Sequence, residues 1–152
     1  MAGTFTNLLY HIIFSTKDRL PSIQPEWRDR LWEYMGGIIR GEGGIALRIG
    51  GVADHVHLLV TLKPKHDVST ILQKLKSKSS GWVHELFPDS GMWWQEGYGA
   101  FSYSKSQVDA VINYIQKQEL HHAKKSFKEE YIDFLEKFEI EYDEKFIFKE
   151  LI

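Results

Sequence analysis

The chain has 152 residues, of which 43% are hydrophobic, 14% aromatic and 26% charged, with a formal net charge of −2 and no cysteine. This length and apolar content predict a single folded domain over residues 1–152. Without cysteine the chain has neither a thiolate metal ligand nor a thiol nucleophile, so any metal must be held by His, Asp, Glu, Asn or Gln. No stretch approaches the roughly 20 apolar residues of a membrane span, and the N-terminus lacks a signal-peptide pattern. We therefore expect a cytoplasmic protein with no membrane partner.

Charge is unevenly distributed along the chain. Residues 126–152 hold nine acidic and four basic side chains, whereas residues 1–125 hold fifteen basic and twelve acidic ones. We expect the acidic C-terminal tail, residues 126–152, to lie away from any bound nucleic acid. A basic stripe between residues 63 and 84 is of the kind that contacts phosphates, although most such runs are solvated surface.

The first predicted elements alternate between strand and helix. Residues 4–16 are rich in aromatic and β-branched side chains, which favours a strand. Apolar residues at helical spacing follow Pro25 and stop at the glycines of residues 41–44. Residues 45–51 and 55–62 have the pattern of two strands joined in a hairpin.

The second half repeats this alternation. Residues 68–87 form a second predicted helix, which a proline ends, and residues 92–104 are strand-like with two glycines that indicate a bulge or bend. A third helix is expected over about residues 107–123, with Ser106 as its N-cap, and the tail offers a short helix and then an extended apolar piece. The order β-α-β-β-α-β is that of the ferredoxin-like (RRM-like) α+β fold, an antiparallel sheet with helices on one face. The third helix is an extra element after that core.

Two histidines interrupt the predicted strand "HVHLLVTL". Alternation places His55, His57 and Leu59 on one face, while apolar residues fill the other. Two imidazoles at this spacing can bridge one divalent cation, which needs at least one further ligand. The histidine-triad nucleotide hydrolases require a third alternating histidine, and that position is Leu59. The alternative is a strand face open to solvent, which antiparallel sheets often have.

Tyr114 and Gln118 lie four residues apart on the third predicted helix. They share a face away from the expected buried stripe, with His121 one turn further along. This pair either faces the histidine side of the sheet or is simply polar surface, and spacing alone favours polar surface.

Taken together, these motifs resemble the HUH-type single-tyrosine transposases of small bacterial and archaeal insertion sequences, which act on single-stranded DNA. The resemblance is carried by "YHIIFSTKDR", "HVHLLV", "WQEGYGAFSYS" and "VINYIQKQELHH" and covers about residues 9–142. It implies that His55, His57 and Gln118 hold a divalent metal, Mg²⁺ or Mn²⁺, and that Tyr114 is the nucleophile.

The resemblance also implies a reaction and partners. The protein would cleave and rejoin single-stranded DNA at insertion-sequence ends through a 5′-phosphotyrosine intermediate, would recognise DNA hairpins, and would work as a homodimer in which the tyrosine helix of one subunit can complete the site of the other. The expected DNA contacts combine phosphate-binding lysines and a base-stacking aromatic ring: Lys74, Lys76, Lys78 and Tyr98.

Several alternatives stay open at this stage. Trp93 and Trp94 are candidates for base stacking, with core packing the favoured interpretation. Asp54 either assists the metal or is a turn residue, and His121 and His122 are expected to be charges at a helix C-terminus. Two other functions compete with a transposase: a domesticated protein that binds DNA hairpins without cutting, and a metal-dependent phosphodiesterase that uses water.

Overall fold

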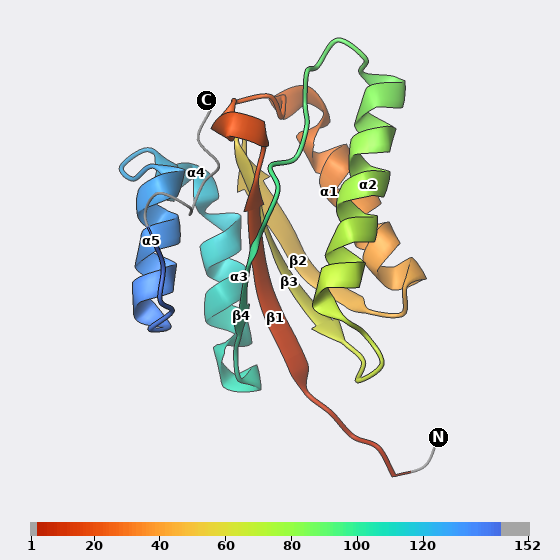
Figure 1. Ribbon diagram of the computed structural model, residues 1–152, viewed down its shortest axis with the longest axis vertical. Coiled ribbons are helices and arrows are strands. Elements are labelled where there is room, and N and C mark those ends of the chain that lie inside the picture. The colour runs from red at the N-terminus through yellow and green to blue at the C-terminus, as the bar shows by residue number, and fades with distance from the viewer. Residues whose placement is uncertain (1–2, 144–152) are drawn as a thin grey trace.

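The computed structural model describes residues 3–143. Four strands, two short 3₁₀ turns and five α-helices follow one another in these residues (Figure 1). In chain order they are β1 (Leu8–Ser15), η1 (Lys17–Arg19), α1 (Pro25–Gly41), β2 (Ile45–Val52), β3 (His55–Leu62), α2 (Val68–Leu86), β4 (Gly99–Ser102), η2 (Lys105–Gln107), α3 (Val108–Gln116), α4 (Gln118–His122) and α5 (Phe127–Lys137).

The sheet confirms the predicted ferredoxin-like topology. Its strand order is β2-β3-β1-β4, and each neighbouring pair is antiparallel. Strands β2 and β3 form the expected hairpin, and β3 also pairs with β1 along its whole length. The histidine strand is therefore central, with a strand on each side.

One face of the sheet carries the main core under α1 and α2. The side chains of β3 that alternate with the histidines are fully or almost fully buried there. Pro25 begins α1, where its missing N–H costs nothing, and the Asp67 side chain caps α2 by accepting from the Ser69 N–H at 3.0 Å. This layer is the one that the apolar spacing of residues 25–41 and 68–87 predicted.

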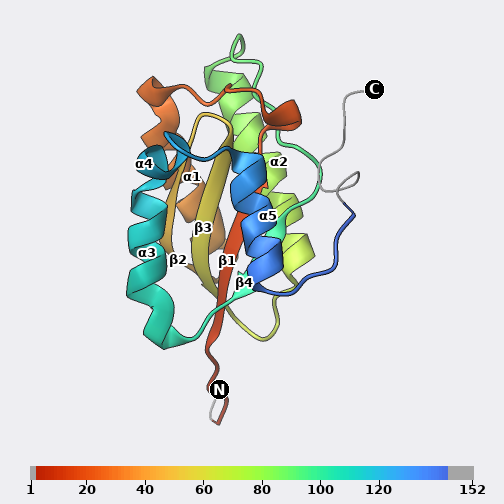
Figure 2. The same cartoon turned by 90° about the vertical axis from the view of Figure 1, so that its left-hand side faces the viewer.

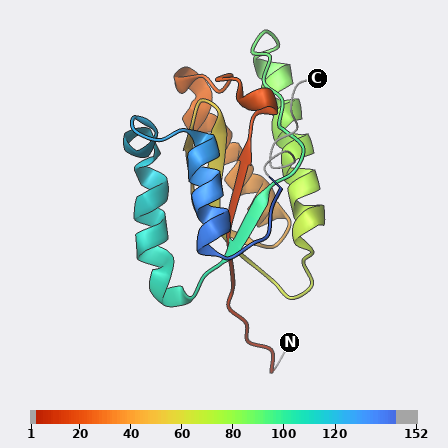
Figure 3. The same ribbon diagram turned by 60° about the vertical axis from the view of Figure 1, so that its left-hand side comes forward.

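Helices also cover the opposite face of the sheet. The predicted fold placed its helices on one face and added only one extra helix. Helix α3 contacts β2 and β3, and α4 contacts β2. Helix α5 packs on β1 and β4 through a second apolar cluster that contains Ile13, Phe101 and Phe134. Figures 2 and 3 show α3 and α5 both lying across this face. The approach of α3 is close at Gly50, where an added Cβ would lie 2.9 Å from the Cγ2 atom of Ile115.

Three predicted boundaries are wrong. Within residues 92–104 the ladder spans only Gly99–Ser102, with one further bridge at Trp94. The bend that the glycines of this segment predicted lies between the bridge and the ladder, at Gly97, whose φ is +92°. The helix expected over residues 107–123 breaks at Lys117, whose ψ of 22° is not helical. The N-cap position of α3 is Gln107 rather than Ser106, and Ser104 is the N-cap of the preceding turn η2, where its N–H donates to Oε1 of Gln107 at 3.0 Å.

Two remaining features concern the tail and the membrane. The short helix expected in the tail is α5, while most of the extended apolar piece lies outside the described residues. Within residues 3–143 no helix combines the length and the apolar character needed to cross a membrane.

Candidate active site

The two strand histidines are completely buried under the second helical layer. His55 and His57 have no exposed surface, so the alternative of a solvent-facing strand is wrong. The Nδ1–H of His55 donates to the carboxylate of Asp54 at 2.7 Å. Asp54 thus orients the first histidine from the hairpin turn.

Tyr114 and Gln118 face these histidines, as the functional interpretation of their spacing required. The break at Lys117 separates them, so Tyr114 lies near the end of α3 and Gln118 begins α4. Gln118 is 1% exposed, and its Oε1 lies 3.0 Å from Nε2 of His55. The structure therefore brings the tyrosine, the amide and both histidines together within one chain.

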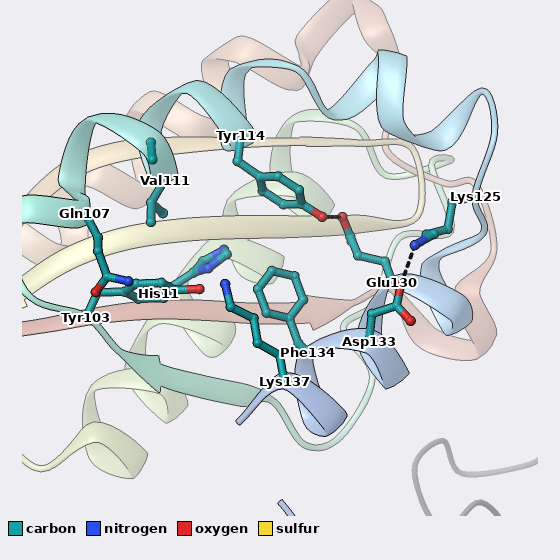
Figure 4. Close-up of a pocket in the computed structure, with 11 residues that line it drawn as sticks. His11, Tyr103, Gln107, Val111, Tyr114, Lys125, Glu130, Asp133, Phe134 and Lys137 are labelled. Atoms are coloured by element: carbon teal, nitrogen blue, oxygen red, sulfur yellow. Dashed lines mark hydrogen bonds and ion pairs between the residues drawn. The ribbon is translucent and has the colours of Figure 1, made fainter. Parts of the chain in front are cut away.

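Glu130 on α5 lies at the centre of the group, and it was not predicted. Its Oε1 accepts from Nε2 of His57 at 3.0 Å, while its Oε2 accepts from the Tyr114 hydroxyl and, at 3.3 Å, from the Gln118 amide. Figure 4 shows the Tyr114 hydroxyl meeting this carboxylate. The acidic tail, which was expected to lie away from bound nucleic acid, thus contributes this residue to the site.

A sequence signal for Glu130 does exist. It lies three residues after Phe127 and four before Phe134, and both rings are buried. This spacing puts a charged side chain on the apolar stripe of an amphipathic helix, where a carboxylate persists only with strong partners. Glu130 is 2% exposed.

Three further histidines surround the group. His122, expected to be a helix-end charge, instead directs its Nε2 to Oε1 of Glu130 at 3.1 Å, and its ring centroid lies 4.3 Å from that of His55 on β3. Its neighbour His121 stacks on the Tyr114 ring at 4.4 Å between centroids. His11 on β1 lies behind His57, with its Nε2 2.8 Å from Nδ1 of His57.

Burial and the carboxylate set the protonation of these groups. Burial alone would raise the pKa of Glu130, but hydrogen bonds from His122, His55 and His57 outweigh it and hold that pKa well below its usual range. Burial lowers the pKa of His57 to about 4, whereas for His55 the bonds to Asp54 and Glu130 overcome burial and raise the pKa to about 9. Burial, together with the contact to Glu130, raises the pKa of Tyr114 well above its ordinary value.

These donors form a set that can hold a metal ion. One nitrogen from each of His55, His57 and His122 and one oxygen of Glu130 all lie within 4.8 Å of one another. Imidazole nitrogens and a carboxylate oxygen are common ligands of divalent transition ions.

The predicted phosphate-binding lysines lie elsewhere, on α2, which packs against the other face of the sheet. The Lys74 ammonium pairs with Glu42 at 2.7 Å, and the Lys76 ammonium donates to the carbonyl oxygens of Gln95 and Gly97 at 2.8 and 2.5 Å. Lys78 is exposed. Tyr98, 37% exposed, lies with its ring centroid 6.0 Å from the Lys76 ammonium.

The two tryptophans before β4 behave differently from each other. Trp94 packs against the main core, and its indole N–H donates to Ser79 at 2.9 Å, as the core interpretation predicted. Trp93 is 56% exposed and lies against the ring of His84, so core packing is the wrong interpretation for this residue.

Comparisons with known proteins identify the family of this chain. The family profile described as "Transposase IS200 like" matches residues 4–118. The chain is 29% identical over 124 residues to the transposase for insertion sequence element IS200 of Salmonella typhimurium. The matched region covers 78% of this chain and 81% of that protein. It is 25% identical over 122 residues to the ISDra2 transposase TnpA of Deinococcus radiodurans, with 76% and 87% covered.

Solved structures give the same result. The fold matches the crystal structure of a transposase from Deinococcus radiodurans with a TM-score of 0.64 and 26% identity, over 78% of this chain and 95% of that one. It also matches a REP-associated tyrosine transposase bound to a REP hairpin, with a TM-score of 0.59 and 13% identity, over 80% and 72% of the two chains. Because the family profile spans most of the sequence, this chain belongs to the IS200-like transposase family.

Proposed function

We propose that this transposase cleaves and rejoins single-stranded DNA at the ends of an insertion sequence, with Tyr114 as nucleophile and a divalent metal, Mg²⁺ or Mn²⁺, at the buried histidines. One observation carries the proposal. The Tyr114 hydroxyl and the ring of His57 meet on the same buried carboxylate, Glu130, although the tyrosine and the histidine come from elements far apart in the chain.

The spacing of the donor atoms fits a metal ion. Metal–ligand bonds of about 2.1 Å place neighbouring ligands roughly 3.0 Å apart in an octahedral site and roughly 3.4 Å apart in a tetrahedral one. Oε1 of Glu130 lies 3.0 Å from Nε2 of His57, 3.1 Å from that of His122 and 3.4 Å from that of His55. Oε1 of Gln118 lies 3.0 Å from Nε2 of His55.

The fit supports the expected ligands His55, His57 and Gln118, and it adds His122 and Glu130. A site with several imidazoles favours Mn²⁺ over Mg²⁺, because Mg²⁺ prefers oxygen ligands and keeps its waters. When bound, the cation would polarise the scissile phosphate and withdraw charge from Glu130.

The chemistry of the chain's own groups is a transesterification. The Tyr114 oxygen bonds to phosphorus, the bond from phosphorus to the 3′ oxygen breaks, and the 3′ oxygen leaves as a hydroxyl. The strand is left joined through a 5′-phosphotyrosine link. Attack of a 3′-OH on this link reverses the step, because phenolate is a better leaving group than an alkoxide, so resealing needs no ATP.

Glu130 has a defined place in this step. Its Oε2 accepts the Tyr114 hydroxyl hydrogen, which positions the phenol and offers the nearest acceptor for its proton. Burial first and the charged carboxylate second raise the pKa of Tyr114, so the phenol keeps its proton in the resting site.

Substrate and assembly belong to the same proposal. A hairpin substrate is supported by the structural neighbour that was solved with a REP hairpin. Phosphate contacts by Lys74, Lys76 and Lys78, base stacking on Tyr98, and a homodimer stay predictions. Tyr114 and the histidines meet within one chain, so the arrangement does not require a tyrosine from a second subunit.

A covalent-adduct assay tests the proposal. The protein is incubated with Mn²⁺ and a 5′-labelled or 3′-labelled single strand that carries the hairpin of the insertion-sequence end, and the products are resolved under denaturing conditions. We expect a protein-linked 3′ fragment with the wild type and with Tyr103→Phe, and none with Tyr114→Phe. Tyr103 is a matched control because its ring lines the same pocket.

Two other results of this assay would each contradict the proposal and indicate a different function. Binding of the hairpin without cleavage in any variant would indicate a non-cutting hairpin-binding protein. Cleavage that survives Tyr114→Phe without an adduct would indicate a phosphodiesterase that uses water.

A further inference from the structure

A cavity of about 380 Å³ opens between α3 and α5, beside the Tyr114 hydroxyl (Figure 4). Its walls are mainly apolar and aromatic, including Val111, Phe134 and the ring of Tyr103. This volume is in the lower part of the range of about 300–1,000 Å³ that small-molecule sites occupy. It suits one compact, planar group rather than a length of chain.

The innermost wall carries a polar atom without a partner. His11 is 1% exposed, and its Nδ1 is buried with no hydrogen-bond partner among residues 3–143. A buried polar atom without a partner is destabilising and therefore rare, so such atoms commonly mark the place of a ligand or an ordered water. Figure 4 shows His11 between Tyr103 and Phe134, with the amine of Lys137 directed to the same space.

The hydrogen bond between His11 and His57 determines whether Nδ1 of His11 carries a hydrogen. A cation on Nε2 of His57 leaves the hydrogen of that ring on Nδ1, which then donates to Nε2 of His11 across 2.8 Å. The neutral ring of His11 then carries its own hydrogen on Nδ1. Nδ1 itself is buried, so the cavity meets the ring of His11 rather than this donor, and its lining also includes the charged side chains of Lys125, Asp133 and Lys137.

We propose that this cavity binds one unpaired nucleobase of the DNA strand, adjacent to the phosphate that Tyr114 attacks, through stacking on its aromatic walls. This inference rests on the proposed single-stranded DNA substrate. The Lys137 ammonium, 5.7 Å from the centroid of Tyr103, lies where the neighbouring phosphate would run. Base insertion between aromatic rings is a common way in which proteins hold single strands.

Nuclear magnetic resonance tests the pocket without relying on cleavage. The isotope-labelled full chain with Mg²⁺ is titrated with the four deoxynucleoside 5′-monophosphates and with 2-deoxyribose 5-phosphate, which has the phosphate but no base. We expect nucleotides, and not the sugar phosphate, to shift the backbone signals of Val111 and Phe134 and the imidazole signals of His11. Lys137→Met should weaken nucleotide binding several-fold.

A pair of variants on α3 makes the test specific. Ala110 is exposed and lines the cavity, whereas Asn113 is exposed on the same helix and does not line it. We expect Ala110→Phe to weaken nucleotide binding at least tenfold and Asn113→Phe to leave it unchanged. Equal shifts with the sugar phosphate, binding insensitive to Ala110→Phe, or no shift up to about 10 mM nucleotide would each overturn the proposal.

The two proposals fail separately. Because Tyr114→Phe removes only the nucleophilic oxygen, it should still bind nucleotides in the cavity. A failed covalent-adduct assay with intact nucleotide binding would refute the transposition chemistry alone, and an adduct without a nucleotide site would refute the nucleobase pocket alone.

Discussion

Replacing Glu130 with glutamine is expected to destabilise the metal-free protein and to weaken metal binding. The carboxylate accepts hydrogen bonds from His57, His122, Tyr114 and Gln118 while it is 2% exposed. Glutamine has nearly the same shape, but it removes the charge and places an NH₂ group among donors, so at least one buried donor loses its acceptor.

The magnitude follows from this loss. Removing one partner of a buried charged network costs about 3–5 kcal/mol. For a chain of this length, 1 kcal/mol corresponds to roughly 2–4 °C in Tm, so we expect Tm to fall by about 10 °C. Mn²⁺ should raise the Tm of the wild type and have little effect on Glu130→Gln, because the variant lacks the charged ligand that Oε1 supplies and its affinity falls at least 100-fold, equivalent to about 2.7 kcal/mol.

Differential scanning calorimetry with and without Mn²⁺, together with calorimetric titration of the metal, measures both effects. Asp133→Asn is the matched control: it removes one carboxylate from the same helix, but that side chain is 54% exposed and pairs with Lys125 on the surface. A Tm of Glu130→Gln within about 2 °C of the control, or equal Mn²⁺ affinity in the two variants, would refute the central role of this carboxylate.

Two further predictions concern protonation and packing. In the metal-free protein, the free energy of unfolding should fall by about 3 kcal/mol as pH rises from 6.5 to 9. The folded pKa of His55, about 9, lies above its ordinary 6.5, so its contribution is complete below pH 6.5 and lost above pH 9; a flat profile in denaturant titrations would contradict this. Gly50→Ala should cost about 1–3 kcal/mol and shift α3, because its Cβ would lie 2.9 Å from Ile115, whereas Gly81→Ala, with open space around it, should stabilise α2 by about 0.5–1 kcal/mol. Equal Tm values for the two glycine variants would show that α3 does not pack tightly at Gly50.

Local patterns were sufficient for most of the secondary structure. Strand alternation and helical spacing predicted β1, the β2–β3 hairpin, α1 and α2 within a few residues, because each element buries one regular face. They were weaker where backbone geometry overrides side-chain pattern. The fourth strand begins only after the bend at Gly97, and the break at Lys117 divides a helix whose apolar spacing is continuous.

The site was predictable where its residues follow local rules and unpredictable where they do not. His55 and His57 alternate on one strand, and Tyr114 and Gln118 share one helical face, so the amino-acid sequence alone reveals their spacing. His122 and Glu130 lie beyond the end of the family match at residue 118. Nothing in the local spacing of the chain relates α5 to β3.

The sequence by itself determined the order of the strands and helices and the residue types that can hold a cation and attack phosphorus. The tertiary structure alone decided that the acidic tail returns over the sheet and inserts a carboxylate between the histidines and the tyrosine. The physical reason is that α5 docks through apolar side chains such as Phe134 onto β1 and β4. The hydrophobic effect is non-directional, so the apolar side chains of α5 do not by themselves specify a partner. The docking position of α5 is defined only once the sheet has formed and offers an apolar face.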